Sequence, residues 1–185
     1  ITASENIWVW DRWWYYDNSW ALRDMVQNHL FEVLSLVTMD VPSSIESDAI
    51  RQEKLKVFKS LKLGKDFDKN IVFWQYEWYK EEKSVNLYSK TETFVSMKIE
   101  VDSWQFSWVP IYLKTWKFLN EKSTKIVVEF KEIPDILFKK FGFIDKNRII
   151  LEIQPNETIN IHFNIKENWN SKEIQRVKSK FSKEI

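Results

Sequence analysis

Asp24 and His29 are the residues of this 185-residue chain whose types and spacing are best suited to chemistry. A histidine titrates near neutral pH and can accept a proton as a general base, and a carboxylate accepts hydrogen bonds from hydroxyl groups. Both fall in one predicted helix, five positions apart, which is about 140° around an α-helix. They are not a simple pair within the helix, but both could contact a ligand lying across its N-terminal half. A lone helical histidine is nevertheless more often a satisfied core or surface residue than a catalyst.

Lys117 and Lys122 are two further candidates, because they follow a predicted strand, although a lysine at such a place is usually only solvated. The sequence has no glycine-rich phosphate loop and no nucleophile elbow. It has no cysteine and two histidines, which excludes thiolate metal sites and leaves little for a histidine metal site. The residues alone therefore predict a globular domain with one candidate catalytic histidine and no metal.

The charge balance excludes some partners. Lys and Arg number 28 and Asp and Glu number 27, so the net charge of +1 lacks the basic excess typical of proteins that bind nucleic acid or anionic membranes. No apolar run approaches the roughly 18 residues of a membrane span. The first residues do not resemble a signal peptide, and the absence of cysteine suits a reducing compartment. We expect a cytoplasmic protein, and, because the sequence begins without Met, a fragment.

The elements that must position these residues change in type near residue 70. A first helix is predicted from about Ser19 to Met39, capped by residues 17–19 and ended before Pro42. A second helix is predicted from Asp48, as its cap, to about Leu61. The apolar stripe expected on the first helix consists of Leu22, Met25, Val26, His29, Val33 and Leu36.

Strands are predicted beyond residue 70, because apolar and polar residues alternate there. These segments are 95–101, 110–118, 126–128, 149–153 and 159–165. One apolar and one polar face are typical of a half-solvated antiparallel sheet. The expected fold class is therefore α+β, with two N-terminal helices packed on a large, mostly antiparallel sheet. We expect one domain over residues 1–170 and a polar, basic tail over 171–185.

Four segments carry a family resemblance. Residues 12–30, RWWYYDNSWALRDMVQNHL, closely resemble the RGGYYDxxGALRDMVQNHL stretch of the glucose-6-phosphate dehydrogenase family. Residues 91–95, 109–117 and 153–157 are similar to the family's TETFV, VPFYLRTGK and IQPxE segments, in the family's order. The resemblance extends from Ile1 to about Glu167 and implies the middle part of that family's C-terminal substrate domain.

The resemblance implies a role for each candidate residue. His29 matches the base that takes the proton of the sugar C1 hydroxyl while hydride leaves C1 for NADP. Asp24 and Glu5 match residues that hydrogen-bond sugar hydroxyls. Lys117 matches a substrate-binding lysine, and Lys122 is a weaker match. The implied reaction is the oxidation of D-glucose 6-phosphate to 6-phosphogluconolactone in the oxidative branch of the pentose phosphate pathway, by a homodimer or homotetramer formed through the sheet.

Two family features have no counterpart in these residues. One is the Rossmann domain with its glycine-rich phosphate turn, which is expected to bind most of the NADP. The other is the RIDHYLGKE segment, which supplies much of the sugar-phosphate site and the Asp that orients the catalytic His. These 185 residues alone are therefore expected to be inactive. The alternative function is a non-catalytic binding or assembly module that retains the sheet and has lost the chemistry.

Tryptophan stands at many of the family's glycine positions, and the chain has 11 Trp and 2 Gly. A tryptophan at positive φ is strained, and an indole at Trp20 or Trp116 would crowd Asp24 and Lys117. Our hypothesis is a decoding artefact, since some bacterial lineages translate UGA as glycine and others as tryptophan. The alternative is a real protein whose Trp-rich loops have lost activity. The positions concerned are Trp13, Trp14, Trp20, Trp74, Trp78, Trp108 and Trp116.

Overall fold

The computed structural model divides the chain into two compact units, residues 1–122 and 123–185, which we describe separately. The structure describes residues 1–6, 21–64, 66–82, 85–117, 121–132, 144–167 and 173–182. Within these ranges, no helix has both the length and the apolar character that a membrane span requires.

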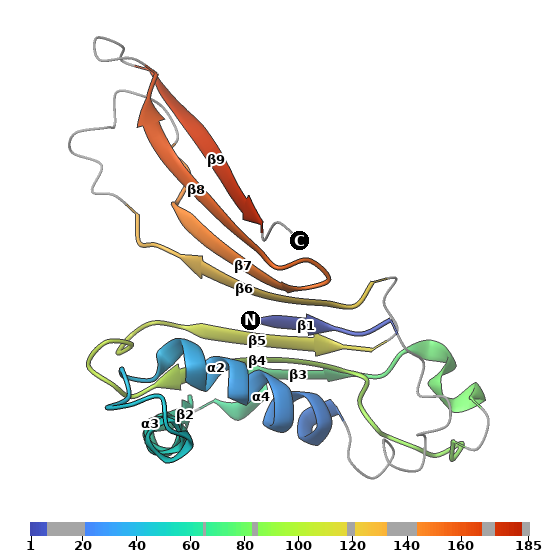
Figure 1. The fold of residues 1–185 in the computed structure, drawn as a ribbon. Coiled ribbons are helices and arrows are strands. Elements are labelled where there is room, and N and C mark those ends of the chain that lie inside the picture. Colours follow the sequence, from blue (N-terminus) through green and yellow to red (C-terminus); the bar gives the residue numbers. More distant parts are fainter. Residues whose placement is uncertain are drawn as a thin grey trace. The chain divides into compact units, whose positions relative to one another are not determined.

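The first unit is built on a mostly antiparallel sheet (Figure 1). Its central strand β4 (Phe94–Val101) pairs antiparallel with β5 (Ile111–Trp116), and also with β2 (Leu61–Leu63) and β3 (Ile71–Trp74). The N-terminal strand β1 (Thr2–Ser4) pairs parallel with β5. The alternation of β4 is confirmed, because Val95, Met97, Ile99 and Val101 are buried.

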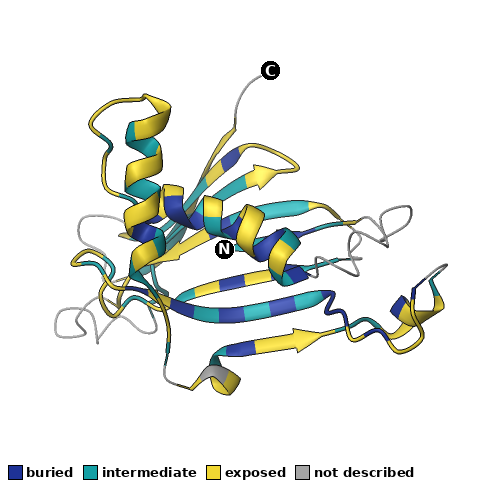
Figure 2. Cartoon of the chain, turned by 90° about the horizontal axis from the view of Figure 1, so that it is seen from below, coloured by how far each residue is buried: buried dark blue, intermediate teal, exposed yellow. Residues whose placement is uncertain are grey.

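Helices cover this sheet, as the α+β prediction requires. A π-helix, η2 (Leu22–Leu30), continues directly into α2 (Phe31–Thr38), and α3 (Ser47–Ser60) follows. Two short helices, α4 (Phe67–Asn70) and the 3-10 helix η3 (Glu77–Glu81), complete the described helices of the unit. Figure 2 shows buried positions along the central strands and along one side of the continuous helix formed by η2 and α2. The core joins four residues of the helix to three residues of β4 and one of β5: Met25, Val26, Leu30, Leu34, Val95, Met97, Ile99 and Leu113.

The prediction of which residues form the apolar stripe of the first helix was partly wrong. Met25 and Val26 are buried as predicted, but Leu36 is 54% exposed and His29 is exposed too. The reason is the π-helical turn, in which the amide of residue i+5 bonds the carbonyl of residue i. The Phe31 amide bonds the Val26 carbonyl in this way. The wider turn moves the buried side to Leu30, Leu34 and Thr38.

The second helix begins and ends close to the predicted bounds, and Val57 is buried in it. Its N-cap is Glu46, not Asp48 as predicted; Asp48 instead pairs with Arg51 in the first turn. The caps predicted for the first helix, residues 17–19, lie outside the described residues.

The second unit is a four-stranded antiparallel sheet of consecutive strands. The strands are β6 (Ser123–Glu129), β7 (Arg148–Gln154), β8 (Thr158–Lys166) and β9 (Ile174–Ser182). Part of the polar, basic segment predicted over 171–185 forms β9, which pairs with β8 along its whole length. Its basic residues are typical of a sheet edge, where lysines discourage pairing with another chain.

Trp108 has a φ of 67°, the left-handed conformation that glycine adopts without strain. It is the only non-glycine residue with positive φ among the residues that the structure describes. This conformation fits the glycine expected at that position. Trp13, Trp14 and Trp20 lie outside the described residues.

Candidate functional site

Three of the five predicted site residues meet in the first unit. The Nζ atom of Lys117 forms an ion pair with the Glu5 carboxylate and lies 3.3 Å from Oδ2 of Asp24. The lysine side chain is 11% exposed and each carboxylate side chain 21%, so the three charges lie together in a partly desolvated place. We call Glu5, Asp24 and Lys117 the carboxylate–lysine cluster.

Neighbouring parallel strands place two members of the cluster. In the β1–β5 pairing, Ser4 is opposite Trp116, so Glu5 and Lys117 follow the carboxyl ends of the two strands side by side. The Glu5 amide donates to the Trp116 carbonyl at 3.1 Å, and the Lys117 amide donates to the Thr93 carbonyl at 3.0 Å. These backbone bonds hold both side chains at the same edge of the sheet.

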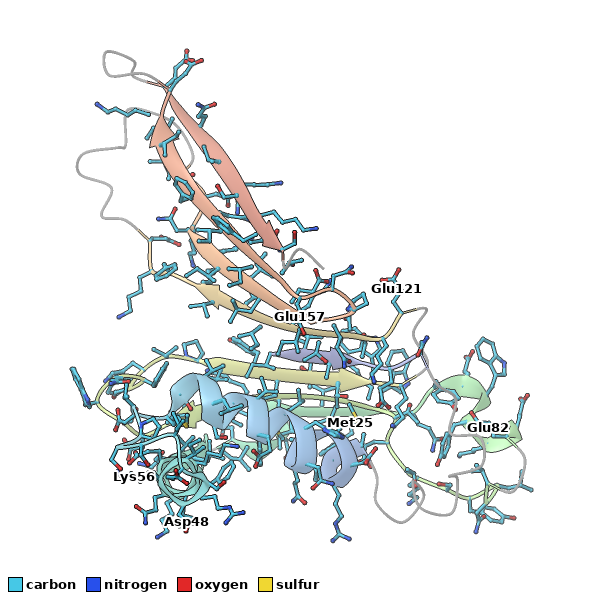
Figure 3. The ribbon with its side chains drawn as sticks, viewed as in Figure 1. Met25, Asp48, Lys56, Glu82, Glu121 and Glu157 are labelled. Carbon is cyan, nitrogen blue, oxygen red and sulfur yellow. The ribbon has the colours of Figure 1, made fainter. Side chains whose placement is uncertain are left out.

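The π-helix η2 supplies Asp24 and also carries His29. Met25, the residue after Asp24, is buried against the sheet and is labelled in Figure 3. A hydrogen bond from residue i+5 to residue i makes five residues about one full turn. Asp24 and His29 therefore lie on similar sides of this helix, in contrast to the separation of about 140° expected for an α-helix. The His29 side chain is exposed.

Lys122 is not part of the cluster. Its side chain is exposed, and it makes no ion pair with the residues in the described ranges. Ser4 Oγ nevertheless donates to the carbonyl of Glu121 at 3.0 Å, which tethers the segment carrying Lys122 to the strand that precedes Glu5. Glu121 is labelled in Figure 3.

The cluster contains one more negative than positive charge and has carboxylate oxygens as hydrogen-bond acceptors. Such groups suit a ligand rich in hydroxyl groups, because each carboxylate can accept from vicinal hydroxyls. No group of three or more His, Cys, Asp or Glu side chains in the described part of the chain is arranged to hold a metal ion. Trp116 packs its ring against Phe94, with centroids 5.8 Å apart.

Glu92 is a functional candidate to which the sequence analysis assigned no role. It lies in the segment 91–95, is only 8% exposed, and bonds the first residues of η2. The similarity of that segment to the family's TETFV was the signal that could have pointed to it.

The fold is shared with part of two solved dehydrogenase structures. The chain superposes with a TM-score of 0.87 and 28% identity on a structure described as glucose-6-phosphate dehydrogenase in complex with its substrate glucose-6-phosphate, over 98% of this chain and 38% of that one. A Mycobacterium avium glucose-6-phosphate 1-dehydrogenase gives a TM-score of 0.86 and 31% identity, over 98% of this chain and 39% of that one. The model of the family "Glucose-6-phosphate dehydrogenase, C-terminal domain" matches residues 1–184. The chain belongs to this family.

Curated relatives agree. The glucose-6-phosphate 1-dehydrogenase of Buchnera aphidicola subsp. Schizaphis graminum is 40% identical over 179 residues, covering 88% of this chain and 36% of the relative. The enzyme of that name from Bacillus subtilis is 38% identical over 191 residues, covering 96% of this chain and 39% of the relative. The chain thus spans less than half the length of the relatives it matches.

Proposed function

We propose that this chain forms the sugar-binding part of an enzyme that oxidises D-glucose 6-phosphate to 6-phosphogluconolactone with NADP+ as the hydride acceptor. The observation that carries the proposal is the convergence of Glu5, Asp24 and Lys117 beside the helix that bears His29. The family, to which the chain belongs over residues 1–184, supports the choice of reaction.

The proposed roles follow from the chemistry of each group. His29 takes the proton of the C1 hydroxyl, and the C–H bond at C1 breaks with its electron pair leaving as hydride, so that the C1 carbonyl of the lactone forms. Asp24 and Glu5 accept hydrogen bonds from sugar hydroxyls. Lys117 holds these two carboxylates in place and donates to a substrate oxygen.

Lys122 is the weaker of the two candidate substrate-binding lysines. Its exposed ammonium can contact the anionic part of the substrate only as a solvated charge, and such contacts contribute little. We therefore expect Lys122 to matter less than Lys117.

No residue of this chain is assigned to the nicotinamide cofactor. The family resemblance implies that a Rossmann domain, which has no counterpart in these residues, binds most of the NADP. The choice of NADP rests on the family resemblance alone. The cytoplasmic location also stays a prediction.

We further propose that the protein is a homodimer or homotetramer formed through the second unit. The strand registers place apolar residues of β6, β7, β8 and β9 on one face of that sheet. Several of them are exposed, including Ile159 at 45% and its cross-strand partner Phe181 at 57%. A contiguous exposed apolar face is typical of an interface between proteins.

The experiment that tests the reaction measures reduction of NADP+ by the full-length protein, with D-glucose 6-phosphate and, as a matched control, D-glucose. We expect turnover that depends on the phosphorylated sugar. Absence of turnover with NADP+ and with NAD+, in protein that is folded by circular dichroism, would favour the non-catalytic binding or assembly module.

A further inference from the structure

The segment Thr91–Thr93 is hydrogen-bonded to two of the three elements that carry the site. The Thr93 carbonyl accepts the Lys117 amide at 3.0 Å. The Glu92 carbonyl accepts the Ala21 amide at 3.4 Å, and the Oε1 atom of Glu92 accepts the Leu22 amide at 3.1 Å. One short segment thus binds the end of β5 and the beginning of η2.

The Glu92 carboxylate supplies a hydrogen-bond acceptor that the start of η2 otherwise lacks. The first amides of a helix have no partner within it, and they are normally satisfied by a side-chain oxygen of the N-cap residue. Ala21, the N-cap of η2, has no such oxygen. Glu92, 70 residues away in sequence, supplies it from the sheet, and a negative charge is favoured at a helix N-terminus.

The bond from Glu92 lies close to both candidate functional residues of η2. Leu22 precedes Asp24 by two residues, within the same first turn, and the five-residue π turn places His29 about one turn beyond Asp24. A shift of the helix start therefore moves the Asp24 carboxylate relative to Lys117 and moves the imidazole with it.

We propose that Glu92 is a positioning residue of the site, which fixes the start of the π-helix through the Leu22 amide and thereby sets the places of Asp24 and His29. This inference rests on the proposed function. Glu92 makes no contact with the substrate in this account. Its effect on catalysis comes from placement, and a misplacement of about 1 Å can cost roughly 10²-fold in rate.

The test compares Glu92→Ala, Glu92→Gln and a control, Glu100→Ala, in the full-length protein. Glu100 is an exposed glutamate of the adjoining strand β4. We expect Glu92→Ala to raise the KM for glucose 6-phosphate about tenfold and to lower kcat roughly 10–10²-fold per folded molecule, with the KM for NADP unchanged. Glu92→Gln keeps an acceptor oxygen at the same place and should recover most of both losses. Glu100→Ala should resemble the wild type.

A merely structural cap would act differently. It would lower the melting temperature and the folded fraction, while each folded molecule of Glu92→Ala kept its KM and kcat, and that result would overturn the inference. Equal defects in Glu92→Ala and Glu92→Gln would also overturn it. His29→Asn separates the two proposals. If that variant loses turnover and Glu92→Ala does not, only the positioning role fails; if His29→Asn keeps full turnover, the proposed function fails.

Discussion

Lys117 and Asp24 are 93 residues apart in sequence, and their side chains form an ion pair with 3.3 Å between Nζ and Oδ2. The same lysine pairs with Glu5. Removing one partner leaves the other charges partly desolvated and uncompensated, which makes such a cluster sensitive to substitution. Substitution of any one of the three residues of the carboxylate–lysine cluster should therefore affect binding through the other two as well.

Lys117→Ala tests the carboxylate–lysine cluster. We expect the KM for glucose 6-phosphate to rise tenfold or more, because a charge-assisted hydrogen bond contributes about 1.5–3 kcal/mol. The KM for NADP should change little. Lys114→Ala is the control, since Lys114 is an exposed lysine of β5, the strand that Lys117 follows. Steady-state kinetics with each substrate varied in turn is the measurement. Equal changes in both KM values, or none, would reduce Lys117 to an ordinary surface lysine.

Trp108→Gly should stabilise the protein. Relief of a left-handed non-glycine residue is worth about 1–2 kcal/mol, and the greater flexibility of unfolded glycine offsets roughly half of it. Trp104→Gly is the matched control, because Trp104 is 87% exposed and does not have positive φ. We expect the two substitutions to shift the melting temperature in opposite directions, upward for position 108. A loss of stability at position 108 would contradict the glycine assignment.

The decoding hypothesis makes a prediction about the natural protein. Peptide mass spectrometry across residues 12–23 should find glycine at positions 13, 14 and 20. Glycine there would also remove the crowding expected from an indole at position 20. Tryptophan at these three positions would end the hypothesis and favour the module without dehydrogenase chemistry.

Ile159→Asp tests the interface proposed for the second unit. Ile159 lies opposite Phe181 on the apolar face, and a charge there should oppose burial between subunits. Asn160→Asp places the same carboxylate on the opposite face of the same strand and is the control. Sedimentation velocity should show dissociation of Ile159→Asp alone. Identical behaviour of the two variants would argue against this face as the interface.

The regular elements were predictable where the apolar pattern was strong. Strands β4 and β8 alternate strictly, and the second helix has a clear buried side, so their places were anticipated. The three-residue strand β1 is too short to show a period, and β9 has few apolar residues because it lies at a sheet edge. A π turn cannot be distinguished from an α turn in the sequence pattern, so His29 was wrongly predicted to lie on the apolar side of the helix.

The site was predictable as a set of residues and not as a geometry. Motif similarity pointed to Glu5, Asp24 and Lys117, and the structure brings these three together. Spacing along the chain could not show that Lys117 bridges both carboxylates, since this depends on the parallel pairing of β1 and β5. Glu92 belongs to a motif that the sequence shows. Its hydrogen bond to the Leu22 amide joins residues that are 70 positions apart, so only the structure reveals it.

The central claim is that His29 is the base for oxidation of the sugar, and His29→Asn in the full-length protein tests it most directly. Turnover of glucose 6-phosphate with NADP+ is followed through the absorbance of the reduced cofactor, and the dissociation constant of glucose 6-phosphate is measured by titration calorimetry. Since general-base catalysis contributes about 10²–10⁴-fold, we predict a fall in kcat of that size with the dissociation constant nearly unchanged. A variant that keeps near-full turnover would contradict the account.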